Sequence, residues 1–127
     1  MGDALVLHGV HEALRVARPG YRTCHIGREV ESEVRRSGFA VMPELCGHGV
    51  GRTIHEEPSV PNFYDRRCRT KLTPGLVIAI EPIIVAGQGT ARMSSDGWTI
   101  RTADRSLSAH YEHTIVITET EPVLLTA

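Results

Sequence analysis

The amino-acid sequence predicts an α+β fold, with two helices at the start of the chain and an antiparallel sheet after them. Apolar residues recur at spacings of three and four up to residue 34, which is the period of an amphipathic helix. From residue 39 onward they form short runs bounded by glycine, proline and polar residues, which is typical of strands. The 127 residues contain no internal repeat and no linker, so we expect one domain over residues 1–127.

Two amphipathic helices account for the first part of the chain. The first ends at Pro19-Gly20, because this pair stops a helix, and the second is predicted over residues 23–37 with Gly38 as its C-terminal cap. The apolar face of the first helix consists of Leu7, Val10, Leu14 and Ala17. The apolar face of the second helix consists of Ile26, Val30 and Val34. Each helix is therefore expected to bury one face.

The rest of the chain is expected to form strands and loops. The turn Thr73-Pro74-Gly75 leads into residues 76–86, which read as a strand or a strand pair. Residues 46–51 are rich in glycine and form a poor helix. Residues 57–71 contain two prolines and many polar side chains, and they are predicted to form a loop. The other predicted strands are residues 39–42, 98–101, 109–118 and 122–126.

Composition excludes several classes of function. Lys plus Arg is 14 against 15 for Asp plus Glu, and the resulting net charge of −1 argues against a nucleic-acid partner. No apolar run approaches the ~18 residues of a membrane span, and no secretory signal is evident, so no membrane partner is expected. The three cysteines are an odd number without CxxC spacing, which argues against a disulfide framework and favours a cytoplasmic protein.

Glu81 interrupts the otherwise uncharged run of residues 76–86. A carboxylate in such surroundings must be paired, protonated or bound to a metal. In the alternative interpretation it lies on an edge strand and reaches solvent, since Pro82 cannot donate to a ladder. The local pattern favours neither interpretation.

Three further residues are candidates for chemistry. Strand alternation places Glu112 on the same face as Val116, and a solvated strand face is the alternative to a ligand role. His48 lies among glycines that leave room for a ligand beside the imidazole, and the alternative is a turn with an incidental histidine. His55 by itself is more typical of a loop histidine.

Together, His48, Glu81 and Glu112 form a donor set for a divalent metal. Imidazole and carboxylate suit Zn, Mn, Co or Fe, and only the fold can bring these separate segments together. The sequence has no HExxH, GxSxG or GxxxxGK[ST] motif, which argues against a zincin, a serine-hydrolase elbow and a P-loop. Cys46 beside His48 leaves a thiol nucleophile as an alternative, although no orienting partner is visible.

Three segments in this order resemble the C-terminal half of the type I methionine aminopeptidases. They are residues 46–58 (CGHGVGRTIHEEP), residues 72–82 (LTPGLVIAIEP) and residues 96–114, in which DGWT runs on to SAHYEHT. The two predicted helices fit the same pattern. The resemblance covers nearly the whole chain and departs at Ile54, often aromatic in relatives, and at His110, often glutamine.

The resemblance implies a pita-bread fold of two pseudo-symmetric halves and a dinuclear metal site that removes N-terminal methionine from new polypeptides. By position in the motifs, three of the five metal ligands would be His48, Glu81 and Glu112, with Glu112 bridging both metals. Glu81 would also shuttle a proton as a catalytic residue. His55 would bind the substrate and steady the tetrahedral intermediate, and Trp98 would lie near the methionine pocket.

The family's other two ligands are aspartates that precede the helices seen here. We therefore expect residues 1–127 to be a partial domain of a truncated enzyme, with at most one well-ligated metal (Co, Mn, Fe or Zn) and little or no activity alone. The uncovered surface is expected to cause self-association unless a separate N-terminal half covers it. Two alternatives are a non-catalytic pita-bread module that binds proteins or peptides, and a mononuclear metal protein with different hydrolytic chemistry.

Overall fold

The computed structural model describes residues 2–126 and confirms the α+β architecture. Two helices come first, α1 (Gly2–Val16) and α2 (Thr23–Arg36). Within the described residues ten strands follow: β1 (Ala40–Val41), β2 (Gly47–Gly49), β3 (Glu56–Val60), β4 (Val77–Ile80), β5 (Ile83–Val85), β6 (Ala91–Met93), β7 (Ile100–Thr102), β8 (Ser108–His110), β9 (His113–Val116) and β10 (Val123–Leu124). Over the same residues, neither helix is both long and apolar enough to cross a bilayer.

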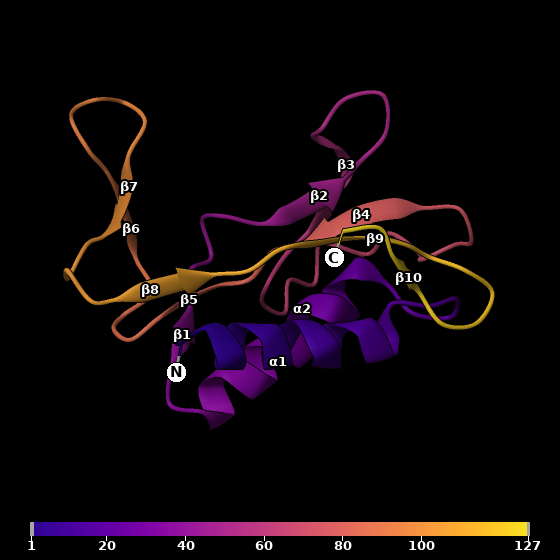
Figure 1. Cartoon of the computed structure of the whole chain (residues 1–127), viewed down its shortest axis with the longest axis horizontal. Helices are drawn as coiled ribbons and strands as arrows, with labels where there is room; N and C mark the ends of the chain where they lie inside the picture. The colour runs from indigo at the N-terminus through magenta and orange to yellow at the C-terminus, as the bar shows by residue number, and fades with distance from the viewer. Residues whose placement is uncertain (1, 127) are drawn as a thin grey trace.

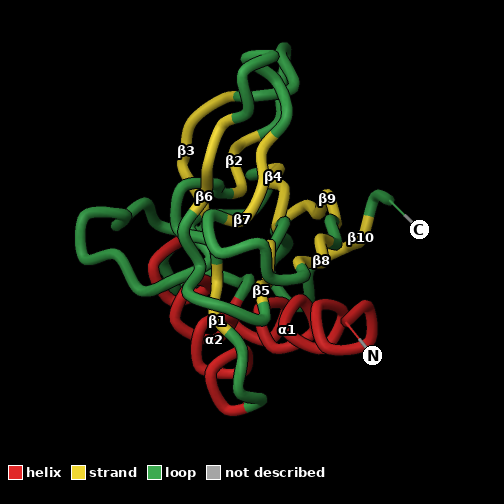
Figure 2. Tube along the Cα trace, turned by 90° about the vertical axis from the view of Figure 1, so that its left-hand side faces the viewer, coloured by secondary structure: helices red, strands yellow, loops and turns green. Residues whose placement is uncertain are grey.

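The strands form two main antiparallel sheets, and both helices lie against one side of them (Figures 1 and 2). The larger sheet has the order β10-β9-β4-β2-β3, and the smaller has the order β1-β5-β8. Strands β6 and β7 form a separate hairpin that projects away from the helices (Figure 1). No helix of the described chain covers the other side of the sheets, and we call this side the open face.

The core lies between the helices and the sheets. The predicted apolar face of α2 is confirmed, because Ile26, Val30 and Val34 are fully buried. On α1, Val10 and Ala17 are buried as predicted, whereas Leu7 and Leu14 lie half-buried at the margin. The sheets contribute Ile78, Ile80, Ile84, Ile115 and Ile117 to the same core. Burial of each such side chain stabilises the fold by roughly 1.5–3 kcal/mol.

One long antiparallel ribbon joins the two sheets. Along the chain, β4 continues into β5, and β8 continues into β9 (Figure 1). Ile80 pairs with His113 on one side of the gap, and Ile83 pairs with His110 on the other. The register therefore continues across the gap without a shift, and residues 81 and 82 lie opposite residues 112 and 111.

The gap in the ribbon arises at Pro82. This residue has no N–H, so it cannot donate to Tyr111 on the facing strand. The reverse bond is present, from the Tyr111 N–H to the Pro82 carbonyl, at 3.4 Å. The strand predicted at residues 109–118 is therefore divided into β8 and β9, and the run predicted at residues 76–86 is a strand pair.

Two local predictions were wrong. Strand β3 occupies residues predicted to form a loop, and it tolerates Pro58 because it is the edge strand of its sheet. The strand predicted at residues 98–101 begins only at Ile100. The Asp96 carboxylate accepts hydrogen bonds from the backbone N–H groups of Trp98 (3.0 Å) and Thr99 (2.9 Å), and these bonds hold both residues in a turn.

The predicted turn before β4 is confirmed. The Leu76 N–H donates to the Thr73 carbonyl at 3.1 Å, and Gly75 has a φ of 88°. Only glycine adopts this conformation without strain at the third position of such a turn. The turn sets the start of β4, the strand that ends just before Glu81.

Candidate metal centre

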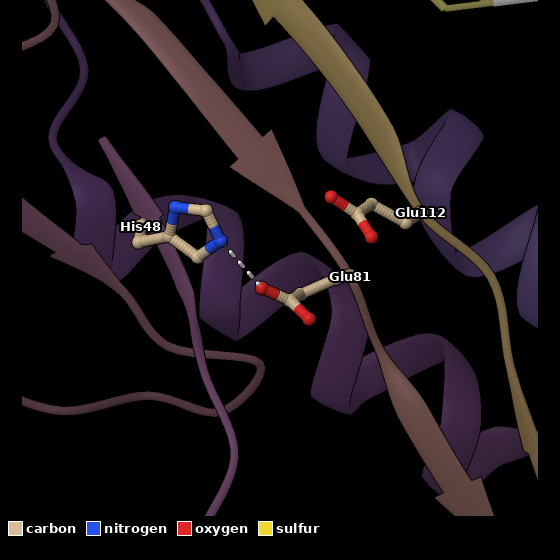
Figure 3. Close-up of side chains that lie close together, drawn as sticks. All are labelled: His48, Glu81 and Glu112. Atoms are coloured by element: carbon tan, nitrogen blue, oxygen red, sulfur yellow. Dashed lines mark ion pairs between the residues drawn. The ribbon is translucent and has the colours of Figure 1, made fainter. Parts of the chain in front are cut away.

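Glu81 and Glu112 face each other at the gap in the ribbon (Figure 3). The hydrogen bond from the Tyr111 N–H belongs to the neighbouring pair, Pro82 and Tyr111. Because hydrogen-bonded and non-hydrogen-bonded pairs alternate, the two glutamates form a non-hydrogen-bonded pair, in which side chains come closest. Their chain neighbours Ile80 and His113 are buried on the helix side, so the glutamates lie on the open face. Two negative charges directly opposite each other repel, which makes the pair receptive to a cation.

A buried amide fixes the backbone of Glu81. Asn62 is fully buried, and its Nδ2 donates to the carbonyls of Glu81 and Leu45, both at 3.2 Å. Leu45 lies just before β2, so this side chain ties the end of β4 to the strand that carries His48. The amide thus substitutes for ladder bonds at the place where the ladder ends.

His48 reaches the same point from the adjacent strand. Gly49 of β2 pairs with Ile78 of β4, which places His48 on the open face beside Ala79. A Cβ at Gly47 would overlap the Ala79 carbonyl, so glycine is needed for this close approach. The His48 Nε2 lies 3.2 Å from the Glu81 Oε1 (Figure 3).

The orientation of the His48 ring prepares Nε2 for a ligand. Its Nδ1 lies 2.9 Å from the Gly49 carbonyl oxygen, which only an N–H at Nδ1 can satisfy. This contact leaves Nε2 as the ring nitrogen available to a metal ion. Metal-binding histidines commonly have their other ring nitrogen held by a backbone carbonyl in this way.

The three residues form a compact donor set. One ligand atom from each of His48, Glu81 and Glu112 lies within 4.8 Å of the other two. The side chains of His48 and Glu81 are 14% and 18% exposed, and Glu112 is exposed. One imidazole nitrogen and two carboxylate oxygens suit a divalent transition ion, and the exposed side leaves room for a water or a substrate atom. The arrangement therefore fits a cation.

His110 also contacts this cluster, although it is not among the site residues predicted from the sequence. Its Nε2 lies 3.5 Å from the Glu81 Oε2, and the hydrogen bond to this carboxylate raises the pKa of His110 above its usual value. A signal was available, because alternation along the strand puts residue 110 on the same face as Glu112.

The structure brings His55 to the cluster but not Trp98. The ring centroids of His55 and His48 are 4.2 Å apart, and His55 is exposed on the loop between β2 and β3. Trp98 lies in the turn of the β6–β7 hairpin, with 87% of its surface exposed. Figure 1 shows this hairpin apart from β2, β4 and β9. Its predicted role near a methionine pocket stays a prediction.

The environment of Cys46 disfavours a thiol nucleophile. Burial raises the pKa of the Cys46 thiol above its usual value, and the nearby Cys68 raises it further. The Cys46 thiol donates a hydrogen bond to the Pro43 carbonyl oxygen, with 3.7 Å between Sγ and the oxygen. Nucleophilic cysteines need the opposite, a lowered pKa.

A comparison with known sequence families finds a match over most of the chain. The profile of metallopeptidase family M24 matches residues 4–119. The chain belongs to this family. The chain is 46% identical over 129 residues to the methionine aminopeptidase of Escherichia coli (strain K12). This match covers 99% of this chain and 49% of that protein. The M24 chain thus spans about half the length of the curated relatives it matches.

Solved structures of the M24 family share the fold. The methionine aminopeptidase of Rickettsia prowazekii superposes with a TM-score of 0.92 at 33% identity, over 98% of this chain and 50% of that one. The methionine aminopeptidase of Thermotoga maritima also has a TM-score of 0.92, at 36% identity, over 97% of this chain and 49% of that one. The prolidase of Pyrococcus furiosus has a TM-score of 0.72 at 26% identity, over 98% of this chain and 31% of that one. The pita-bread prediction is therefore confirmed.

Proposed function

We propose that this chain contributes the His48–Glu81–Glu112 part of a metalloaminopeptidase that removes N-terminal methionine from peptides. The observation that carries the proposal is the convergence of three donors within 4.8 Å. One donor comes from β2, and the other two come from the facing strands at the gap in the ribbon. Membership of a metallopeptidase family and the names of the relatives support the reaction class.

Each residue has a defined task in the proposed reaction. A divalent cation held by His48, Glu81 and Glu112 would supply Lewis-acid activation of water and of the peptide carbonyl. Glu81 accepts a proton from the attacking water at its carboxylate and passes it to the leaving amine. His55, exposed beside His48, donates a hydrogen bond to the carbonyl oxygen as negative charge develops there. Trp98 is the residue that we propose to contact the methionine side chain of the substrate.

We further propose that the described chain holds one cation and has little or no aminopeptidase activity by itself. Three protein ligands suffice for a single catalytic ion in other folds, whereas a second ion would share only Glu112. The donor set is compatible with Co, Mn, Fe or Zn.

A polypeptide that supplies the other half of the site, or a second copy of this chain, is the proposed protein partner. The supporting observation is apolar surface that no described residue covers. The exposed fractions are 50% for Val123, 45% for Leu124, 55% for Leu125 and 85% for Leu107. Burial of such surface favours association. The cytosol is the proposed compartment, since all three cysteines are unpaired.

The test combines ion binding with hydrolysis of a peptide that begins with Met-Gly. Equilibrium dialysis against Co²⁺, Mn²⁺, Fe²⁺ and Zn²⁺ is expected to give about one ion per chain for the native protein and none for His48→Ala, with slow or undetectable cleavage. Failure of the native protein to bind any of the ions would overturn the proposal. Rapid cleavage that needs the ion and His48 would overturn only the expectation of low activity.

A further inference from the structure

The carboxylate of Glu81 lies between two imidazoles. Its Oε1 is 3.2 Å from the His48 Nε2, and its Oε2 is 3.5 Å from the His110 Nε2. The two histidines come from different strands, β2 and β8, which belong to different sheets. Each carboxylate oxygen thus lies against a histidine nitrogen at the point where the two sheets join.

The ribbon itself places His110 beside Glu81. Residue 110 pairs with Ile83, and the residue opposite Glu81 is Glu112, so His110 is the diagonal neighbour of Glu81 on the same face. Long side chains on diagonal positions are within reach of each other. The His110 side chain is 45% exposed and that of Glu81 is 18% exposed, so His110 meets the carboxylate from the more solvent-exposed position.

We propose that His110 is a positioning residue that holds the Oε2 of Glu81, so that the Oε1 faces His48 and the cation. This inference rests on the proposed function and names a residue that acts through one of its ligands. Among the described residues the compact donor set contains His48, Glu81 and Glu112 but not His110. His110 therefore acts on the carboxylate rather than on the ion.

The physical reason is preorganisation. A free glutamate side chain loses rotamer freedom when it binds an ion, and it turns away from Glu112 because the two charges repel. A donor that already holds one oxygen reduces both costs before the ion arrives. Partners that orient metal ligands in this way commonly change ion affinity by roughly 10–100-fold when they are removed.

The experiment measures Co²⁺ affinity and the visible absorption of the bound ion in four proteins: native, His110→Ala, His110→Gln and His11→Ala. Glutamine keeps an N–H donor of similar reach, and His11 is an exposed histidine of α1 that serves as the matched control. His110→Ala is expected to bind about 10–100-fold more weakly with an altered spectrum. His110→Gln is expected to stay within about threefold of the native affinity, and His11→Ala to be unchanged. Circular dichroism checks that all four proteins are folded.

Two results would overturn the proposal separately from the proposed function. If His110→Ala binds Co²⁺ as tightly as the native protein while His48→Ala does not bind, the cation site stands and the positioning role fails. If His110→Gln is as weak as His110→Ala, donation to Glu81 is not the cause. Absence of binding in the native protein would instead overturn the proposed function, and the role of His110 with it.

Discussion

Replacing Glu112 by glutamine is expected to make the metal-free protein more stable and the metal-loaded protein less stable. The change removes one of two facing carboxylates and leaves the size and shape of the side chain nearly unchanged. Without a cation the native pair is repulsive, so its loss is favourable. With a cation the same pair is attractive through the ion, so its loss is unfavourable.

The size of the effect follows from the geometry. A ligand oxygen of Glu81 and one of Glu112 lie within 4.8 Å of each other, and at that outer limit two unit charges repel by about 3.5 kcal/mol at an effective dielectric constant of 20 and by about 0.9 kcal/mol at 80. Because Glu112 is exposed, the lower figure applies, and we expect a gain of ~1 kcal/mol without a cation. For a chain of this length that gain raises the melting temperature by roughly 4 °C. An ion at one hundred times its dissociation constant stabilises the native protein by about 2.7 kcal/mol, and the variant gains less.

The assay is thermal unfolding at pH 8, first in a chelator and then in excess Co²⁺. Glu119→Gln, an exposed glutamate beyond the end of β9, is the matched control and is expected to shift neither curve. The reasoning is refuted if Glu112→Gln melts below the native protein in the chelator, or if both proteins gain equally from Co²⁺.

Three other outcomes follow from the same structure. Asn62→Ala is expected to lower the free energy of unfolding by about 1–3 kcal/mol, because the Glu81 and Leu45 carbonyls lose a buried donor. The same change is expected to weaken Co²⁺ binding. A denaturant titration that finds unchanged stability would contradict this prediction. Ile115→Ala is expected to lower the free energy of unfolding by about 2–5 kcal/mol, because it opens a cavity under the sheet. The folded fraction is expected to keep its cation stoichiometry. Calorimetry measures the change in stability, and a loss under about 1 kcal/mol would argue against a packed core at this position. In the metal-free chain the pKa of His110 is expected to lie above its usual value. Its contact with Glu81 therefore stabilises the fold at low pH, and this contribution is lost as the pH rises through the folded-state pKa. An NMR titration in which Glu81→Gln leaves the His110 midpoint unchanged would contradict the assignment.

The helices and the alternation of β9 could be predicted from the sequence because they depend on local periodicity. Ile26, Val30 and Val34 recur at helical spacing, and all three are buried. Ile115 alternates with Val116 between the covered and the open face, as the period of two requires.

The facing of Glu81 and Glu112 could not be predicted in this way. It depends on the register between the strands that carry them, which puts two residues 31 positions apart in the chain opposite each other, and periodicity does not contain that register. The motif resemblance supplied the two ligands, and the structure supplies the cause of their facing, which is the register that continues across the gap at Pro82.

The remaining differences have physical reasons of their own. Pro58 argued against a strand because a central strand cannot accommodate proline, but β3 lies at the edge. His110 departs from the family pattern, and strand alternation places it on the same face as Glu112. Its contact with Glu81 needs the diagonal geometry of the ribbon, which a single strand does not reveal.

The most direct test of the central claim is anomalous diffraction from a crystal of the native chain soaked in Co²⁺. We expect one strong peak at ligand distance from the His48 Nε2 and from a carboxylate oxygen of both Glu81 and Glu112, about 2.0–2.2 Å from each. A peak at another histidine with none between these three residues would contradict it, and so would a fully soaked crystal without a peak at this site.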